Sequence, residues 1–175
     1  MRTKHGQSST VVRQIGIGLI ACATLAISGC QDSTSPGDFL PGLSIRTGAE
    51  TIHFASFGGG NRITVPITVT NNSDKTLNLA YCSESLERFS LRGWTMVYSP
   101  VCLQANVQTL PPIPVGTSLT FDFYAYDNPQ QYPGFRFTDS PNVYRVRLGL
   151  WIVDNGTSQP LPGDASVTNS FRVEP

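Results

Sequence analysis

The chain has 175 residues, and its 12 basic and 12 acidic side chains give a formal net charge of zero. Charged residues make up 14% of the sequence, well below the share of about 25% in an average soluble protein. Nucleic-acid-binding proteins need an excess of basic side chains to displace counterions from phosphates, so this balance argues against that class. The hydrophobic share of 39% is too high for a disordered chain of such low charge, and the length allows a single domain.

The first thirty residues are typical of an export signal. Three basic residues, Arg2, Lys4 and Arg13, precede an apolar run at residues 15–27, and no acidic residue occurs before Gln31. This run is too short for a transmembrane helix, which needs about 20 apolar residues. A basic start, a short apolar stretch and small residues after it indicate a secretory signal peptide.

Residues 25–30, Leu-Ala-Ile-Ser-Gly-Cys, resemble the lipobox of bacterial lipoproteins. The resemblance implies cleavage before Cys30, a diacylglycerol on its sulfur, and an acyl chain such as palmitate on the new amino group. More than one acyl chain makes membrane anchoring stable. We therefore expect a lipoprotein signal peptide at residues 1–29; an ordinary secretory signal cleaved near residues 21–23 remains the alternative.

The residue after the lipidated cysteine helps to predict whether the protein stays at the inner membrane or moves to the outer membrane. By resemblance to enterobacterial lipoproteins, an Asp at this position would indicate retention at the inner membrane, and this chain has Gln31 instead. We therefore expect a lipid-anchored protein of the bacterial cell envelope, at the outer membrane and facing the periplasm or the surface. Loss of residues 1–29 leaves nine basic and twelve acidic residues, a net charge of −3.

After the predicted cleavage site, residues 30–42 are polar, contain proline and glycine, and show no periodicity. This composition predicts the lipidated Cys30 followed by a flexible tether. The folded domain is expected at residues 43–175.

From Leu43 onward apolar and polar side chains alternate, as expected for strands with one buried and one exposed face. Turn signals rich in glycine, asparagine and proline separate the runs. Several short strands spaced in this way predict an all-β sandwich or barrel of six to nine strands. The clearest runs are residues 62–69, 77–81, 119–124, 144–152 and 167–173.

Two of the turns and one strand start resemble immunoglobulin-like and fibronectin-III-like modules of bacterial envelope proteins. They are residues 71–75 (Asn-Asn-Ser-Asp-Lys), 116–121 (Gly-Thr-Ser-Leu-Thr-Phe) and 142–146 (Asn-Val-Tyr-Arg-Val). The resemblance implies a single immunoglobulin-like antiparallel β-sandwich after a helical signal peptide and a flexible tether. It also implies that the hydroxyl of Tyr144 bonds back to the backbone, as in a tyrosine corner.

Two further features bear on the sandwich. Pro66 lies inside a clean strand pattern, and because proline cannot donate to a ladder, we expect an edge strand or a bulge there.

Cys82 and Cys102 are only 20 positions apart and fall on the outward face, so they predict an external disulfide and not an antibody-type core bridge. Two free thiols, or half of a zinc site, are the alternatives.

Few residues suggest catalysis. His53 is the only histidine beyond the signal peptide, and no nucleophile elbow or phosphate-binding loop occurs. Asp122, Asp127 and Asp139 are grouped closely enough to consider calcium binding or acid–base chemistry, but they lack the pattern of a calcium loop. We therefore expect no enzyme activity, no cofactor and no metal.

Aromatic residues give the candidate binding surface. Some fall on strand faces assigned to solvent, and others, with Phe135, fall in the two longest stretches expected to be irregular, residues 83–100 and 127–142. Exposed aromatics with few charges are typical of recognition surfaces; the alternative is that they fold back as a second small core. The candidates are Trp94, Tyr98, Tyr124, Tyr126, Tyr132 and Trp151.

The sequence thus favours a lipid-anchored, non-enzymatic binding or assembly module whose partners are the membrane, through the anchor, and a protein or a glycan. One alternative is a sandwich-type carbohydrate-binding module. Another is a proteinase-inhibitor-like domain, which the turn at residues 71–75 and the Gly-x-Ser-Leu-x-Phe pattern at 116–121 weakly resemble. The third is a small hydrolase that uses His53 or the pair Asp122 and Asp127.

Overall fold

The computed structural model describes residues 39–80, 82–101, 110–128 and 134–175. These residues all belong to one compact unit, Asp32–Pro175. The predicted signal peptide, Cys30 and most of the tether lie outside the described residues. In the part of the chain that is described, no helix is long and apolar enough to cross a membrane.

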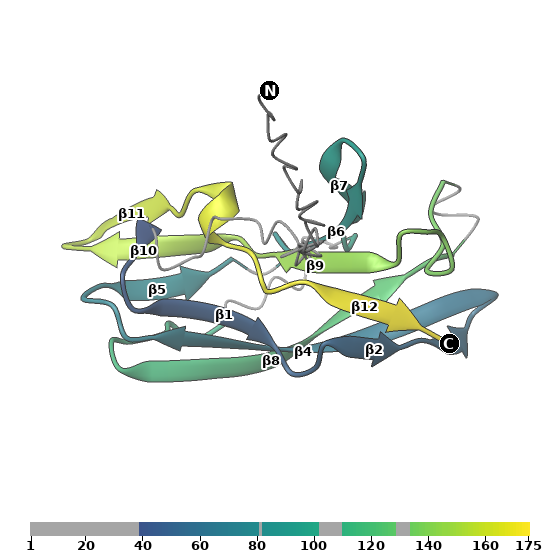
Figure 1. Cartoon of the computed structure of the whole chain (residues 1–175). Coiled ribbons are helices and arrows are strands. Elements are labelled where there is room, and N and C mark those ends of the chain that lie inside the picture. Colours follow the sequence, from purple (N-terminus) through teal and green to yellow (C-terminus); the bar gives the residue numbers. More distant parts are fainter. Residues whose placement is uncertain (1–38, 81, 102–109, 129–133) are drawn as a thin grey trace, which may run out of the picture. The chain divides into compact units, whose positions relative to one another are not determined.

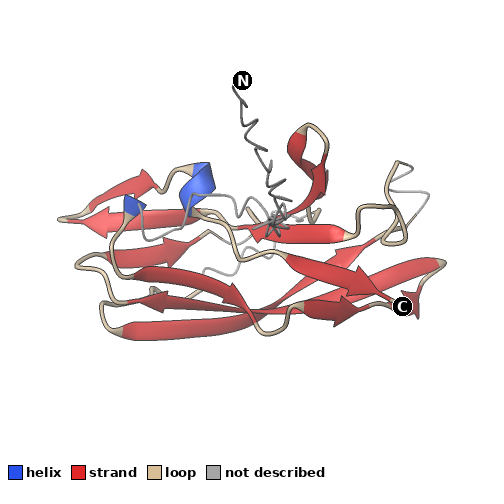
Figure 2. Ribbon diagram, viewed as in Figure 1, coloured by secondary structure: helices blue, strands red, loops and turns tan. Residues whose placement is uncertain are grey.

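The described domain is built from strands, as Figures 1 and 2 show. A short 3-10 turn, η2 (Gly163–Ala165), precedes the final strand. The all-β prediction is therefore confirmed, although the strands are more numerous than expected. They are β1 (Leu43–Thr47), β2 (Thr51–His53), β3 (Ala55–Phe57), β4 (Gly60–Asn71), β5 (Thr76–Leu79), β6 (Ser85–Ser90), β7 (Gly93–Tyr98), β8 (Thr117–Tyr126), β9 (Val143–Arg147), β10 (Leu150–Asp154), β11 (Thr157–Pro160) and β12 (Phe171–Glu174).

The first layer is organised around the long strand β4. On one side β4 pairs antiparallel with β8 over ten consecutive residue pairs, from Arg62↔Tyr126 to Asn71↔Thr117. On its other side β1 pairs with one half of β4 and β3 with the other half. Directly opposed residues share a face, so the apolar residues of β4 and β8 point to the same side.

Pro66 lies where these two partial pairings leave a gap. The β1 pairing ends at Thr47↔Ile67 and the β3 pairing begins at Ala55↔Arg62. The carbonyl of Pro66 accepts a hydrogen bond from the Gly48 amide at 2.8 Å, and its register with Asp122 shows no shift. The predicted bulge is therefore absent, whereas the alternative of an edge at this point holds, because β4 has no strand partner at Pro66 on this side and the missing amide falls where no ladder bond is needed.

The second layer contains the sheets β2-β12-β9-β6-β7 and β11-β10-β5. Residues 144–152, expected to be one strand, form β9 and β10 with a break at Leu148 and Gly149. Hydrogen bonds continue across the break, from the Leu148 amide to Ser166 and from the Ala80 amide to Gly149, each 2.8 Å long. The two sheets therefore form one layer along the β9–β10 line, facing the β4 layer (Figure 1).

The chain changes layers between β1 and β2. After pairing with β4, it continues into β2, which runs parallel to β12 with Ile52 opposite Val173. Residues 43–53 thus contribute to both sheets.

The core lies between the two layers, where the alternation predicts it. Ile63, Val65, Ile67 and Val69 of β4 are completely buried. From the other layer, Val146, Leu148 and Leu150 are also buried, so the alternation of the interrupted β9–β10 line continues through its break. Burial of these aliphatic side chains is the main favourable term for the fold.

An aromatic group closes one part of this core. Phe135 and Phe137 come from the loop before β9 and are 3% and 0% exposed. Their rings lie against the fully buried Tyr144, with ring centroids 6.2 Å apart in each case. The alternative that loop aromatics fold back into the core therefore holds for Phe135.

Tyr144 also makes the backbone contact that the sequence predicts. Its hydroxyl donates to the carbonyl of Arg136, eight residues upstream, at 3.4 Å. Burial raises the pKa of Tyr144 to about 12, because the phenolate is disfavoured away from water.

One stretch expected to be irregular is regular. Within residues 83–100, β6 and β7 form an antiparallel hairpin, with Ser90 paired to Gly93. The prediction failed because Leu86 and Glu87 are both buried and the register shifts between them. A bulge of this kind interrupts the alternation by which strands are recognised.

Candidate functional site

The aromatic candidates do not form one surface. Tyr98 on β7 is only 6% exposed, and its ring contacts Phe123 and Tyr126 at centroid distances of 6.2 Å. It belongs to the core edge, so its assignment to a binding surface is wrong. Tyr126 is half-buried beside it, and Tyr132 lies outside the described residues.

Trp151 stands alone on the outer side of the second layer. It lies on β10, opposite Pro160 on β11 and Asn78 on β5, and is 37% exposed. The expectation that it faces solvent is confirmed, but no other candidate aromatic is opposite it.

Tyr124 belongs to the first of two recognition candidates, which we call the aromatic–arginine patch: Phe57, Arg62 and Tyr124. The guanidinium carbon of Arg62 lies 4.8 Å from the ring centroid of Phe57 and 5.9 Å from that of Tyr124. Phe57 is 50% exposed and Tyr124 is 43% exposed. Two open rings therefore flank one cation on the surface of the first layer.

Strand register brings the patch together. Arg62 pairs with Ala55 of β3 on one side and with Tyr126 of β8 on the other, while Tyr124 lies opposite Thr64. Phe57 packs on Tyr126 with centroids 5.4 Å apart. Sequence reasoning found Tyr124 but missed Phe57 and Arg62, because only the three-strand register makes them neighbours.

The buried carboxylate of Asp127 supports the β3–β4 hairpin that carries Phe57. It accepts hydrogen bonds from the backbone amide of Asn61 at 2.6 Å, from the Asn61 side chain at 3.1 Å and from the Phe137 amide at 3.1 Å. Asp127 is 1% exposed. Its role in the structure is to join this hairpin to the aromatic loop.

The other two acidic candidates, Asp139 and Asp122, do not share the hydrogen bonds of Asp127. Asp139 pairs with Arg88 at 2.8 Å, and Asp122 is exposed on β8. Among the described residues no three His, Cys, Asp or Glu side chains are placed to hold a metal ion. His53 is exposed on β2 in the opposite layer from Asp122, with Nδ1 2.8 Å from the carbonyl oxygen of Pro175.

The hydroxyl side chains beside the patch form short ladders across β4 and β8. The hydroxyl groups of Thr68 and Thr120 lie 3.0 Å apart, and Ser118 donates to the hydroxyl of Thr70 at 3.0 Å. Opposed hydroxyl pairs of this kind stabilise a sheet. They lie on the same outer face of the first layer as Tyr124, together with two exposed charged residues: Asp122, between Tyr124 and Thr120 on β8, and Arg46, the partner of Thr68 on β1.

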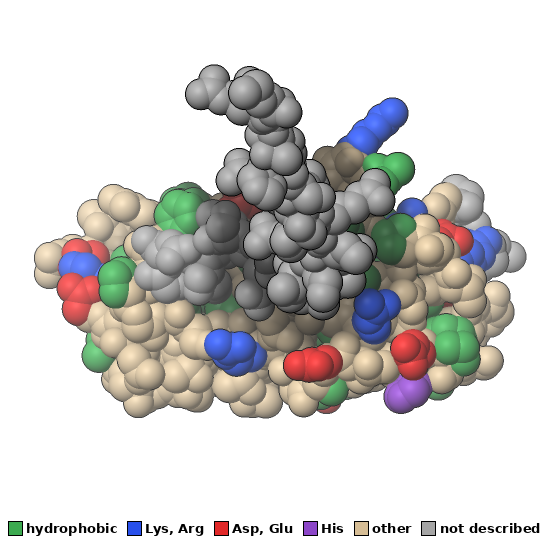
Figure 3. Space-filling view, in the orientation of Figure 1, with side chains coloured by type: hydrophobic (Ala, Val, Ile, Leu, Met, Phe, Trp, Pro, Cys, Tyr) green, Lys and Arg blue, Asp and Glu red, His purple; other side chains and the backbone are tan. Residues whose placement is uncertain are grey.

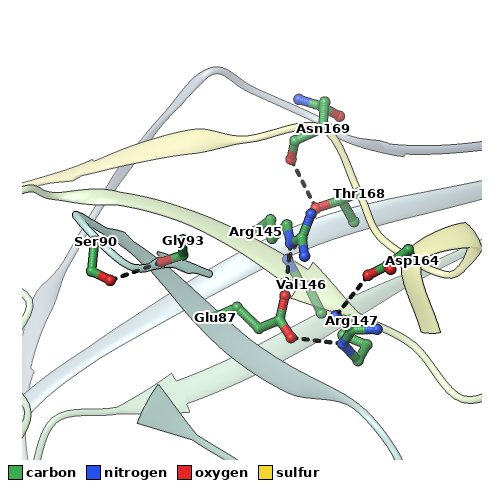
Figure 4. Close-up of polar contacts among 9 residues, drawn as sticks. All are labelled: Glu87, Ser90, Gly93, Arg145, Val146, Arg147, Asp164, Thr168 and Asn169. Atoms are coloured by element: carbon green, nitrogen blue, oxygen red, sulfur yellow. Dashed lines mark hydrogen bonds and ion pairs between the residues drawn. The ribbon is translucent and has the colours of Figure 1, made fainter. Parts of the chain in front are cut away.

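The second recognition candidate lies on the second layer, around Glu87 (Figure 4). Each oxygen of its carboxylate accepts from a different arginine, Arg145 Nε at 2.7 Å and Arg147 Nε at 2.6 Å. Arg147 also reaches the exposed Asp164 of η2 at 3.4 Å. The side chains of Glu87 and Arg145 are 8% and 6% exposed, so this charged group is largely removed from water.

Trp94 covers part of this network. The guanidinium carbon of Arg145 lies 4.4 Å from the Trp94 ring centroid, and Phe89 packs edge-on against Trp94 at 5.3 Å. The indole Nε1 of Trp94 is buried without a hydrogen-bond partner among the described residues. Trp94 therefore joins the charged network to the β6–β7 hairpin.

The β6–β7 hairpin exposes apolar side chains beyond this junction. Leu91 at its turn is fully exposed, Met96 is 62% exposed and Phe89 is 42% exposed. The turn is fixed by Ser90, whose hydroxyl donates to the Gly93 carbonyl at 2.8 Å and accepts from the Arg92 amide at 3.2 Å. Figures 1 and 3 show this hairpin projecting from the sandwich, with basic and hydrophobic side chains on it.

The predicted disulfide involves a residue outside the described part of the chain. Cys82 follows β5 and has a φ of 70°, whereas Cys102 falls in the stretch 102–109 that is not described. The pairing therefore stays a prediction.

Comparisons with known proteins identify no relative by sequence. No protein-family model matches the chain, and no curated protein matches it. Among solved structures, the X-ray structure of Northeast Structural Genomics Consortium target SoR45 is similar over 75% of this chain and 84% of that one, with 11% identity and a TM-score of 0.43.

Proposed function

We propose that the chain is a lipid-anchored protein of the bacterial cell envelope whose β-sandwich is an immunoglobulin-like, non-enzymatic binding module. In this proposal Cys30 carries the lipid at the outer membrane. The domain binds a protein or glycan of the envelope through the aromatic–arginine patch.

The immunoglobulin-like assignment is supported by strand pairing. β4 lies between β1 and β8 in one layer, and β9 lies between β12 and β6 in the other. The switch from β1 in one sheet to β2, parallel to β12, in the other is the arrangement of a first strand divided between two sheets. The hydroxyl of Tyr144, near the start of β9, bonds to the carbonyl of Arg136. A tyrosine corner makes such a contact near the start of strand F in immunoglobulin folds, which supports the assignment of β9 to that strand.

The observation that carries the binding proposal is the exposure of Phe57 and Tyr124 on either side of Arg62. Aromatic and arginine side chains dominate binding energy at protein interfaces; aromatic rings bury large areas with few rotatable bonds. Here the Arg62 guanidinium is held against two rings, so it loses little further freedom when a ligand binds.

A carbohydrate-binding module is the second candidate, and the surface beside the patch favours it. Sugar rings present apolar faces that stack on exposed aromatic rings and hydroxyls that bond to polar side chains. Tyr124 supplies a ring, and the ladder of Thr68 and Thr120 supplies hydroxyls on the same sheet.

A pull-down tests the binding proposal. The full-length protein is cross-linked in native membranes, and the double variant Phe57→Ala/Tyr124→Ala is compared with Trp151→Ala, an exposed aromatic on the other layer. We expect the patch variant to lose its specific partner, by about tenfold or more for two truncated anchors, while the Trp151 variant retains it. Equal recovery of partners with both variants would contradict the patch.

The same variants separate the two ligand classes. In native gels containing envelope polysaccharide, a carbohydrate-binding module migrates more slowly, and the Phe57→Ala/Tyr124→Ala variant does not. Unretarded migration of the natural protein in every glycan tested eliminates this candidate and leaves the protein partner. The anchor is checked independently by incorporation of labelled palmitate, which Cys30→Ala should abolish.

A further inference from the structure

We propose that the β6–β7 hairpin inserts its tip into the interface of an anionic phospholipid bilayer and so fixes the orientation of the domain on the membrane. The proposal rests on the proposed membrane location. It does not depend on which ligand the aromatic–arginine patch binds.

The shape of the hairpin tip fits this partner. Ser90 and Gly93 are the last paired residues, so only Leu91 and Arg92 form the turn. The side chain of Leu91 is fully exposed, and the two hydrogen bonds of the Ser90 hydroxyl hold the turn in place. An isolated, fully exposed leucine on a rigid turn suits insertion between lipid headgroups better than packing on a flat protein surface.

Side chains behind the tip have the chemistry of a membrane interface. Phe89, next to Ser90 on β6, and Met96, two residues beyond Trp94 on β7, expose apolar surface. Trp94 lies between Phe89 and Arg145. Aromatic rings collect at the headgroup level of bilayers, and arginine stems extend along apolar surface while the charge stays in water.

The charge of the hairpin also differs from that of the rest of the chain. Residues 85–98 contain two arginines and one acidic residue, Glu87, a net charge of +1, and Glu87 is paired with Arg145 and Arg147 of β9; the chain after the predicted cleavage site has a net charge of −3. Arg88 is paired with Asp139, while Arg92 at the tip is exposed and forms no ion pair with any described residue. A cation beside an exposed leucine complements anionic headgroups.

The anchor makes even weak insertion effective. A tether of about 12 residues holds the domain within about 40 Å of the membrane, so hairpin binding becomes an intramolecular event at high effective concentration. The lipid would then provide attachment, and the hairpin would decide which side of the sandwich faces away from the bilayer.

The two tryptophans of the chain provide the test. The full-length protein is reconstituted in vesicles of phosphatidylcholine and phosphatidylglycerol that contain brominated lipid, which quenches tryptophan fluorescence. The Trp151→Phe variant reports on Trp94 in the hairpin, and the Trp94→Phe variant reports on Trp151 on β10. We expect Trp94 to be quenched at least about twofold more than Trp151, because tryptophan prefers the membrane interface.

Two substitutions at exposed positions complete the experiment. In the Trp151→Phe background, Leu91→Asp should reduce the fraction of inserted hairpin by about tenfold, since it replaces the leucine proposed to enter the bilayer with a charge. Val115→Asp, at a position that is 51% exposed outside the hairpin, should leave the quenching unchanged. Replacing phosphatidylglycerol with phosphatidylcholine should weaken insertion by about fivefold for one arginine.

The possible failures are distinguishable. If the protein does not float with the vesicles, the lipid anchor proposal fails. If it floats but Trp94 is quenched no more than Trp151, or Leu91→Asp has no effect, the hairpin proposal is overturned while the anchor stands. A protein partner cross-linked to residue 91 together with an unquenched Trp94 would also overturn it.

Discussion

Glu87 shows how one residue can hold two strands and a hairpin together. Its two carboxylate oxygens accept hydrogen bonds from Arg145 and Arg147 on β9. The guanidinium of Arg145 in turn stacks against the ring of Trp94 on β7. Removing a charge from such a buried group costs more than the pair itself contributes, because the remaining charges stay away from water without compensation. The effect of losing Glu87 should therefore be large.

We predict that Glu87→Gln lowers the free energy of unfolding by about 3 kcal/mol, since it removes the buried carboxylate charge that both Arg145 and Arg147 contact. Urea denaturation followed by circular dichroism measures this. The matched control is Asp164→Asn, which removes the 3.4 Å contact of a side chain that is 64% exposed and should cost less than about 1 kcal/mol. Similar effects of the two substitutions would show that burial does not determine the contribution of this network.

At the scale of elements, the sequence predicted strands where one face is buried and the other is wet. The expected run at residues 62–69 lies inside β4, and the run at 119–124 lies inside β8. The β6–β7 hairpin was missed because Glu87 faces outward and yet is buried under its own contacts, so polarity no longer marks the exposed face. The patch was missed for a related reason, because Phe57 and Tyr124 come from separate strands on either side of Arg62.

We predict that Gly93→Ala destabilises the hairpin by about 1–2 kcal/mol, because φ at Gly93 is 95° and a Cβ is disfavoured in that region. Hydrogen exchange of the β6 and β7 amides should accelerate. Gly134→Ala is the control: its φ is not positive and no described atom lies within 4 Å of the added Cβ. That substitution should be neutral or stabilise by up to about 1 kcal/mol, and an equal loss at both positions would refute the argument from backbone strain.

At the scale of the whole molecule, the fold class could be predicted, but the location of the recognition surfaces could not. Periodicity depends on local burial, and it correctly predicted the buried residues of β4 and the β9–β10 line. Neither the switch of the chain from β1 to β2 nor the register of β3 beside β4 is encoded in any local pattern. The sequence also predicts a disulfide between Cys82 and Cys102, of which only Cys82 is among the described residues.

We predict that this disulfide stabilises the domain by about 3 kcal/mol, as expected for a closed loop of this length. The double variant Cys82→Ala/Cys102→Ala should have a correspondingly lower melting temperature in calorimetry. Adding a reductant should lower the melting temperature of the natural protein but not that of the variant. A natural protein insensitive to reductant, with a variant of equal stability, would show that the two cysteines are not paired.

The pairing of β2 with β12 has a consequence for how the domain acquires its fold. His53 at the end of β2 and Pro175 after β12 are in contact although 122 positions separate them. Because ribosomes synthesise the N-terminus first, β2 is made long before its partner, and β12 completes the second layer only when nearly all the described chain is present. Contacts this far apart in sequence slow folding, and until β12 is made, the edges of β2 and β9 that it joins stand open to other chains. Nascent chains of this protein therefore have exposed strand edges of the kind that chaperones protect, and the last strand of the chain, β12, covers them in the finished domain.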